Sequence, residues 1–296
     1  MVNVVSRATV LMRPNYDMGR PKCAITQAPV SLTSQDAARI NSCAGCTFVS
    51  HWLPPARPFQ VLAMRLVTLN LRHGGGRRMP PLLAALLDHV PDILVLTEHR
   101  HNAASTLLRE GLSAAGLRHQ IASHDGPRVN HLLVAARRPL QAVPQSCLRF
   151  DRQRLLTVRV DNLCLVAAHL PNLRAKLPHW QGLLHLASSG RRTPTVYMGD
   201  FNTGHNVRDV ENGPFPFTAS DQMEALLARG WVDAWRHMHP RTREFTWFSH
   251  RGRGFRLDHA FLSPACAPRL RAAWFDHTVR ETGTTDHSAL IVDLEG

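Results

Sequence analysis

The chain has 296 residues, 44% of them hydrophobic and 19% charged, and this composition indicates a folded protein and argues against a largely disordered one. No apolar stretch approaches the roughly 20 residues that a membrane-spanning helix needs, so we expect no membrane partner. The formal charge of +13 favours a polyanionic partner, although only two of the 35 basic residues, Lys22 and Lys176, are lysines, and such an arginine excess is also typical of a GC-rich genome.

The first 63 residues show neither a helical nor a strand period, and prolines interrupt them repeatedly. Two interpretations remain open: a disordered tail, or an extension that precedes a true start at Met64. Cys43-Ala-Gly-Cys46 has the spacing of half a zinc site, but we favour a chance pair within a disordered tail. No cysteine spacing demands a disulfide, so we expect a cytoplasmic protein whose domain occupies residues 64–296.

From Met64 onward, strand-like and helix-like segments alternate. The apolar runs predict strands at 65–70, 93–97, 132–135, 155–160, 163–168, 195–199, 257–262 and 288–293. Helices are expected at 80–89, 102–115 and 218–229, the last two ended by glycines. Asp161-Asn162 separates two strands by only two residues, which predicts a hairpin and therefore mixed sheets. This alternation favours an α/β or α+β sandwich.

Polar residues recur where these strands end. Asn70, Glu98, His169, Asp200 and Asn202 follow four of the apolar runs, Asp258 lies within another, and Asp286-His287 precedes the last. Loops at strand ends are held by a rigid scaffold and commonly carry catalytic groups. Each residue alone has a structural explanation, such as a turn for Asn70 or a buried core position for His169, and only their recurrence favours a site.

The chemistry that these residue types suit is metal-assisted hydrolysis of a phosphodiester. Carboxylates such as Glu98 supply the hard oxygen ligands that Mg²⁺ prefers. A carboxylate or histidine can deprotonate water, and histidines and asparagines can stabilise the phosphoryl oxygens. Asp258 would be costly to bury alone, so we expect a partner such as His287. The sequence contains no Walker-type phosphate loop and no Gly-x-Ser-x-Gly motif.

Six short motifs in one order resemble the endonuclease/exonuclease/phosphatase superfamily. They are Leu69-Asn70, Leu96-Thr97-Glu98, His169-Leu170-Pro171-Asn172, Gly199-Asp200-Phe201-Asn202, Arg256-Leu257-Asp258 and Thr285-Asp286-His287. The last third, including Phe245-Thr246-Trp247-Phe248 and Gly254-Phe255-Arg256-Leu257-Asp258, is similar to the exonuclease III-type AP endonucleases of DNA repair. Such membership implies a four-layered α/β/β/α sandwich of two mixed sheets, with the site at one end.

The resemblance also implies roles for individual residues. Glu98 would bind Mg²⁺, or alternatively Mn²⁺, with help from Asn70 and Asp286. Asp200 would orient or deprotonate the attacking water, while Asn202 and Asn172 would hold the scissile phosphate. His287 would contact the phosphate with its ring fixed by Asp258, and His169 would stabilise or protonate the leaving oxygen. Trp247, Phe255 and Leu257 match the apolar pocket that accepts a flipped abasic sugar, although aromatic residues are more often part of the core.

Two departures weaken the match to abasic-site enzymes: His169 stands where they have tyrosine, and Thr97 where they usually have glutamine. We therefore expect a metal-dependent phosphodiesterase, an endonuclease or exonuclease acting on DNA as a monomer, without fixing abasic-site specificity. One alternative is a phosphoesterase acting on a phospholipid or small phosphoester, as in sphingomyelinase-like members. Another is a nucleic-acid-binding module without catalysis.

Overall fold

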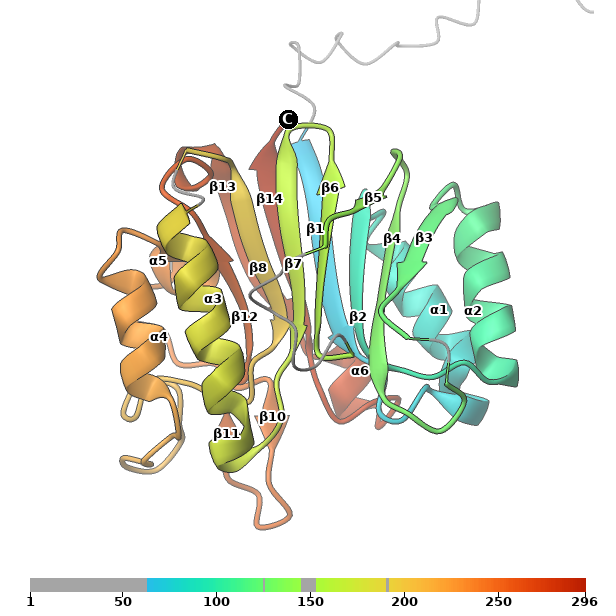
Figure 1. The fold of residues 1–296 in the computed structure, drawn as a ribbon. Helices are drawn as coiled ribbons and strands as arrows, with labels where there is room; N and C mark the ends of the chain where they lie inside the picture. The colour runs from blue at the N-terminus through green and yellow to red at the C-terminus, as the bar shows by residue number, and fades with distance from the viewer. Residues whose placement is uncertain (1–62, 125, 145–152, 190–191) are drawn as a thin grey trace, which may run out of the picture. The chain divides into compact units, whose positions relative to one another are not determined.

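The computed structural model describes residues 63–124, 126–144, 153–189 and 192–296. The predictions for the N-terminal segment, including the Cys43–Cys46 pair, fall outside these residues. Within them lie two six-stranded sheets, a two-stranded hairpin and the helices that flank the sheets (Figure 1). No helix of the described part is both long and apolar enough to cross a membrane.

The first sheet is mixed. Its strands, in spatial order, are β13 (Leu270–Asp276), β14 (Ala289–Glu295), β1 (Ala63–Asn70), β2 (Ile93–His99), β4 (His131–Ala136) and β3 (His119–Ala122). β1 runs parallel to β2 and antiparallel to β14. The two parallel strands therefore end at the same edge of the sheet, which places Asn70 and Glu98 there.

The second sheet is also mixed and also contains one pair of parallel strands. Its order is β5 (Gln141–Ala142), β6 (Leu155–Val160), β7 (Leu163–His169), β8 (Thr195–Asp200), β12 (Asp258–Leu262) and β9 (Val232–Asp233). β7 is parallel to β8, and His169 lies opposite Asp200 at their shared end. The predicted hairpin is confirmed, because Val160 pairs with Leu163 across a two-residue turn. A separate hairpin, β10 (Trp247–Phe248) with β11 (Gly254–Phe255), projects beyond the sheets.

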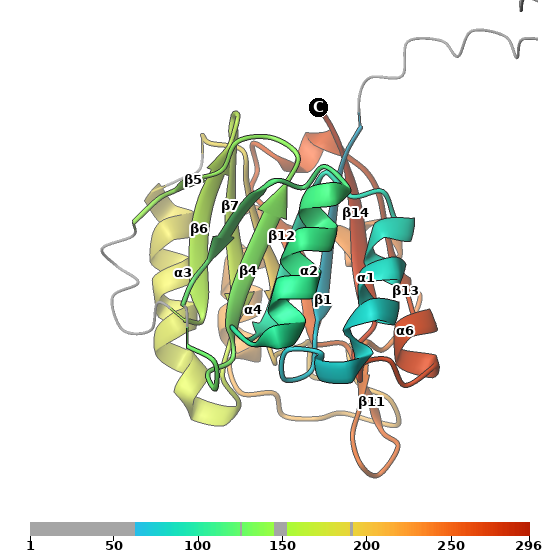
Figure 2. The same cartoon turned by 90° about the vertical axis from the view of Figure 1, so that its right-hand side faces the viewer.

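Helices cover the outer faces of both sheets, as Figures 1 and 2 show. α1 (Met79–Asp88), α2 (Ala103–Ala114) and the short α6 (Thr278–Glu281) belong to the first sheet, and α3 (Leu177–Ser189) and α4 (Ser220–Leu227) to the second. α5 (Ala234–Met238) contacts β12 and β13. One core fills the space between the sheets and two others lie beneath the helices. The predicted four-layered sandwich is thus confirmed.

Local sequence explains the predicted helices. α1 buries Met79, Leu82 and Leu86, which share one face at helical spacing. At the start of α2, the side chain of Asn102 accepts a hydrogen bond from the backbone N–H of Ser105. α4 begins two residues later than expected, because Ala219 before it adopts a left-handed conformation with φ of 71°. The predicted elements did not include helices α3, α5 and α6 or strands β3, β5, β9, β10, β11 and β13.

Candidate active site

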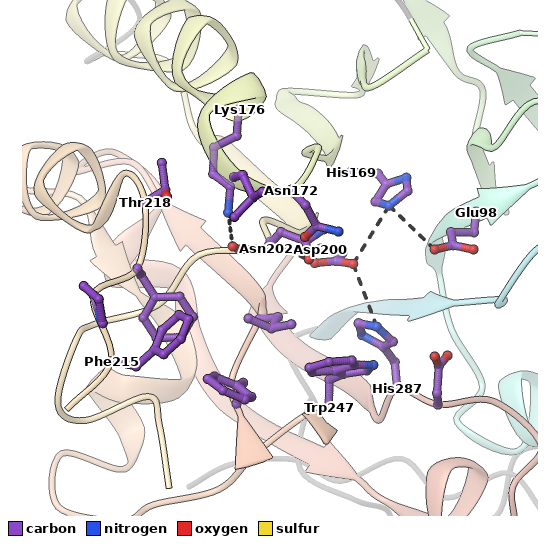
Figure 3. Close-up of a pocket in the computed structure, with 16 residues that line it drawn as sticks. Glu98, His169, Asn172, Lys176, Asp200, Asn202, Phe215, Thr218, Trp247 and His287 are labelled. Atoms are coloured by element: carbon purple, nitrogen blue, oxygen red, sulfur yellow. Dashed lines mark hydrogen bonds and ion pairs between the residues drawn. The ribbon is translucent and has the colours of Figure 1, made fainter. Parts of the chain in front are cut away.

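The strand ends of both sheets surround one pocket of about 310 Å³ (Figure 3). Ten of the twelve predicted site residues line it: Glu98, His169, Asn172, Asp200, Asn202, Trp247, Phe255, Leu257, Asp286 and His287. The other two, Asn70 and Asp258, lie behind this lining and donate to or pair with its members. Asn70 joins the sheets directly, since its Nδ2 donates to Asp200 Oδ2 at 3.2 Å.

Glu98 is held in a strained conformation at the end of β2. Its φ is 54°, a left-handed value that is uncommon for a non-glycine residue, and the pairing of β2 with β4 shifts between Leu96 and His99. The backbone N–H of His73 donates to Glu98 Oε2 at 2.8 Å. Burial opposes ionisation of Glu98, but His169 and this N–H outweigh it, so its pKa is lowered. The carboxylate is therefore ionised and faces the pocket.

A chain of buried hydrogen bonds fixes the residue that follows Glu98. His131 Nδ1 donates to the carbonyl of Val129 at 2.9 Å, so His131 Nε2 accepts from His99 Nδ1 at 2.8 Å. His99 Nε2 in turn accepts from the Ser105 hydroxyl at 2.8 Å. Burial, then His131, lowers the pKa of His99 to about 3, which keeps its ring neutral. Sequence reasoning missed this chain, which anchors the strained turn at Glu98.

Asp200 lies fully buried at the end of β8. Its Oδ1 accepts from the backbone N–H of Asn202 at 2.9 Å, and its Oδ2 lies 3.9 Å from His287 Nε2. Burial raises the pKa of Asp200 to about 7, against the opposing effect of His287. Gly199 permits this placement, because a Cβ there would lie 2.0 Å from the carbonyl oxygen of Ala168 in β7. Asp200 therefore takes up and releases a proton near neutral pH.

The predicted partnership of Asp258 and His287 is present in the structure. His287 Nδ1 donates to Asp258 Oδ2 at 2.8 Å, while Asp258 Oδ1 is buried and has no hydrogen-bond partner among the described residues. Burial lowers the pKa of His287, but the Asp258 carboxylate more than offsets this and raises it to about 10. His287 is therefore a cation whose second N–H, on Nε2, is directed toward Asp200 (Figure 3).

His169 is neutral, in contrast to the cationic His287. Arg154 Nη1 donates to His169 Nδ1 at 3.1 Å, and because guanidinium groups only donate, the proton of the neutral ring is on Nε2. That nitrogen lies 3.8 Å from Glu98 Oε1 and 4.0 Å from Asp200 Oδ2. Burial, together with Arg154, lowers the pKa of His169 to about 4. At neutral pH it is a neutral hydrogen-bond donor.

The carboxylates of the pocket fit a hard divalent cation. Glu98 and Asp286 both line it, and Asp286 is also 3.9 Å from Arg72 Nε. Asn70 presents its amide nitrogen to Glu98 at 3.4 Å, whereas its oxygen accepts from the N–H of Arg72. A second donor set, Asp200, Asp258 and His287, has ligand atoms within 4.8 Å of one another. In that set, however, His287 Nδ1 is already hydrogen-bonded to Asp258.

The far half of the pocket is aromatic. Trp247, Phe255 and Leu257 form part of this wall, as predicted from the resemblance. Phe215 and Phe217 complete it from the loop between β8 and α4, with ring centroids 5.1 and 5.8 Å from that of Phe255. No local signal marks these two rings, because the loop lacks a period and reaches the pocket only through the tertiary fold.

Lys176 is a pocket residue that sequence reasoning passed over. It ends a 3₁₀ turn, Leu173–Lys176, and its Nζ donates to the backbone carbonyl of Asn202. Burial lowers its pKa to about 8. Its rarity was the available signal, since it is one of two lysines among 35 basic residues.

The family model for the endonuclease/exonuclease/phosphatase family matches residues 67–287. The chain belongs to this family. The matched region contains all twelve predicted site residues, from Asn70 to His287.

Two curated relatives share parts of this sequence. Recombination repair protein 1 of Drosophila melanogaster is 27% identical over 152 residues, which cover 44% of this chain and 22% of that protein. An exodeoxyribonuclease of Streptococcus pneumoniae is 24% identical over 166 residues, covering 48% of this chain and 59% of the relative. The chain thus spans less than two thirds of either relative.

Solved structures share the fold over their whole length. An AP endonuclease from Archaeoglobus fulgidus superposes with a TM-score of 0.68 at 21% identity, and covers 79% of this chain and 100% of its own. A Neisseria 3′ phosphatase bound to a product DNA hairpin gives 0.66 at 22% identity, with the same coverage.

Proposed function

We propose that the protein is a divalent-metal-dependent phosphodiesterase that hydrolyses DNA. The observation that carries this proposal is the meeting of an acid–base set from both sheets, Glu98, His169, Asp200 and His287, around one pocket. Relatives named as an exodeoxyribonuclease and as a DNA-(apurinic or apyrimidinic site) endonuclease support DNA as the substrate. The net charge of +13 agrees with a polyanionic partner.

Asp200 is the proposed base. With a pKa of about 7 it is half ionised at neutral pH, which suits proton transfer from water at that pH. The Asn202 N–H and the Asn70 side chain both donate to its carboxylate and fix its orientation. An incoming water in the pocket is therefore presented to a carboxylate that cannot rotate freely.

The two histidines serve different functions in this proposal. His287, a cation fixed by Asp258, attracts a non-bridging phosphate oxygen. His169, neutral with its proton on Nε2, donates a hydrogen bond to the leaving oxygen. Asn172 and Asn202 also line the pocket. Asn202 Nδ2 donates to the carbonyl of Leu170 at 2.8 Å, so in this proposal only its second amide N–H, together with that of Asn172, contacts the phosphate.

Glu98 and Asp286 would hold the metal, Mg²⁺ or Mn²⁺, with Asn70 behind them. When bound, the ion neutralises phosphate charge and stabilises the charge that develops on the leaving oxygen. Trp247, Phe255 and Leu257 would accept an unstacked sugar beside the scissile phosphate.

The test is hydrolysis by the full chain of a substrate panel with Mg²⁺, with Mn²⁺ and with EDTA. The panel contains double-stranded, single-stranded and abasic DNA, RNA, bis(p-nitrophenyl) phosphate and sphingomyelin vesicles. We expect cleavage of DNA that EDTA abolishes and that Asp200→Asn lacks, while Asp221→Asn, on the exposed start of α4, keeps it. Metal-independent cleavage, hydrolysis of sphingomyelin alone, or full activity in Asp200→Asn would overturn the proposal.

A further inference from the structure

The hydrogen bond between Asp258 and His287 joins the two sheets of the sandwich. Asp258 is the first residue of β12 in the second sheet, and His287 lies two residues before β14 of the first. Their side chains meet at 2.8 Å across a sequence separation of 29 positions. Within its own sheet Asp258 is paired with Asp200 of β8, and that ladder does not fix the distance from Asp258 to His287.

Thr246 connects the backbones on which these two side chains stand. It is fully buried and lies directly before β10. Its hydroxyl oxygen accepts hydrogen bonds from the backbone N–H groups of Leu257 at 3.0 Å and Asp258 at 3.3 Å. Its backbone carbonyl accepts from the N–H of Ser288, the neighbour of His287, at 2.9 Å. One residue therefore holds the start of β12 by its side chain and the approach to β14 by its main chain.

Thr246 is itself held in place by the hairpin. Its N–H donates to the carbonyl of Phe255 at 2.9 Å, and the next residue, Trp247, forms a β-bridge with His287 and lies beside it in Figure 3. The hydroxyl oxygen is thus fixed relative to both segments. Buried N–H groups need an acceptor, so without this oxygen the start of β12 must shift to find another one for two successive N–H groups.

Another buried threonine shows what a purely local hydroxyl contact looks like. Thr195, at the opposite end of β8 from Asp200, donates to the carbonyl of Thr193, two positions away, at 3.0 Å. The hydroxyl of Thr246 instead accepts from groups 11 and 12 positions away, on a different strand. Loss of the first contact affects one turn, whereas loss of the second affects how a catalytic side chain is placed.

We propose that Thr246 is a positioning residue for the Asp258–His287 pair. Its hydroxyl sets the place of Asp258, and its carbonyl sets the place of the segment that carries His287. The inference rests on the proposed function and deepens it, because it names the residue that aligns His287 for the phosphate. Thr246 is not among the residues that line the pocket, so it acts through the pair. Displacements below 1 Å are enough to weaken such an alignment.

The direct test is the proton NMR signal of His287 Nδ1, recorded at neutral pH without metal or substrate. A proton held between an imidazole and a carboxylate resonates at low field, and Asp258→Asn identifies the signal by removing it. We expect Thr246→Val to shift the signal upfield or broaden it, and Thr246→Ser, which keeps the hydroxyl, to retain it. Thr195→Val, the matched loss of a buried hydroxyl, should leave it in place. A signal that Thr246→Val does not change would overturn the inference.

Kinetics separate action through the pair from action through the neighbouring Trp247. On the substrate that the hydrolysis panel identifies, Thr246→Val should lower kcat about tenfold and change KM less than about twofold, while Thr246→Ser keeps most of the activity. In the Asp258→Asn background the same substitution should lower kcat less than about twofold, because the pair is already broken. A tenfold fall in both backgrounds, or an effect on KM alone, would contradict positioning of the pair.

Thermal unfolding distinguishes positioning from a general loss of stability. Thr246→Val and Thr195→Val should both melt at a lower temperature than the wild type, but only the first should change the NMR signal and kcat. If Thr246→Val does not fold, Thr246→Ala, which leaves room for a water, replaces it with the same expected outcomes. The NMR signal needs neither metal nor turnover, so this inference can hold where the hydrolysis panel fails. An unchanged signal beside a successful panel would refute this inference alone.

Discussion

Two clusters of buried charge share strand β12, and they show opposite behaviour. Asp258 pairs with His287 behind the pocket lining, whereas the next residue, His259, contacts Asp233 at 3.2 Å and the carbonyl of Thr203 at 2.8 Å. Successive side chains of a strand point to opposite faces, so one strand serves both clusters. The second, which we call the Arg256 cluster, consists of Arg256, Asp209, Asp233, Arg236 and His259.

The two clusters differ in how their buried charges are balanced. In the Arg256 cluster burial alone would raise the pKa of Asp209 and Asp233, but Arg256 outweighs burial and lowers both. In the pocket, burial dominates at Asp200 and Lys176, whose pKa values move toward neutrality from opposite directions, to about 7 and about 8. Arg256, Asp209 and Asp233 therefore stay ionised and are structural, whereas the pocket contains groups whose charge can change near neutral pH.

Replacement of the pocket base should produce the largest effect. Asp200→Asn should lower kcat by about 10³-fold, since a positioned base contributes roughly 10²- to 10⁴-fold. In EDTA the same variant should be more stable than the wild type. Asp200 has a raised folded pKa, so its stabilising contribution is present below its ordinary value of 3.8 and is lost as the pH rises to about 7. The difference in melting temperature should therefore grow from pH 4 to pH 7; a constant difference would contradict the raised pKa.

Replacement in the Arg256 cluster should affect stability and not chemistry. Arg256→Met leaves two buried carboxylates without their cation, and we expect a loss of about 4 kcal/mol in the free energy of unfolding. The lowered pKa values of Asp209 and Asp233 stabilise the protein above about pH 4 and cease to do so as the pH falls further. Urea unfolding at pH 7 and pH 3 should thus show a smaller difference at pH 3. An equal loss at both would argue against the ion pairs.

Asp258→Asn should have an intermediate effect, of about 10²-fold on kcat/KM, because His287 loses the carboxylate that keeps it charged. His287 has a raised pKa, so it stabilises the fold below its ordinary value of 6.5, and this stabilisation is lost as the pH rises toward about 10. The pH–rate profile of the variant should accordingly lose activity at a lower pH than that of the wild type. A profile that coincides with the wild-type one would refute this link.

The smallest effect is expected at the rim of the Arg256 cluster. Arg236 Nη2 donates to Asp209 Oδ1 at 2.9 Å, but Asp209 keeps both of its bonds to Arg256 when Arg236 is replaced. Arg236→Met should therefore cost only about 1 kcal/mol in urea unfolding, with kcat unchanged. A loss as large as that in Arg256→Met would show that the two arginines act as one unit.

The sequence indicated the catalytic constellation because its signals are local. Asn70, Glu98, His169, Asp200 and Asn202 stand where apolar runs end, and parallel strands such as β7 and β8 end at the same edge. The pairing of Asp258 with His287 followed from the cost of burying a lone carboxylate. The helices expected at 102–115 and 218–229 were marked by the glycines that follow them.

The rest of the site depends on contacts between distant segments. Phe215 and Phe217 reach the pocket from an irregular loop, and the His99–His131–Ser105 chain forms only once β4 packs beside β2. The orientation of Asn70, with its nitrogen toward Asp200 130 positions away, follows from the stacking of the two sheets.

By itself, then, the sequence determined the positions of the main strands along the chain, the polar residues at their ends and the family. Periodicity and strand ends are local properties of the chain, so they can be recognised without the tertiary structure. Only the tertiary structure decided the protonation states of His169 and Asp200 and the burial of Lys176 in the pocket wall. The physical reason is desolvation: the pKa of a side chain depends on how much water and which charges surround it, and both are set by the packing of the two sheets.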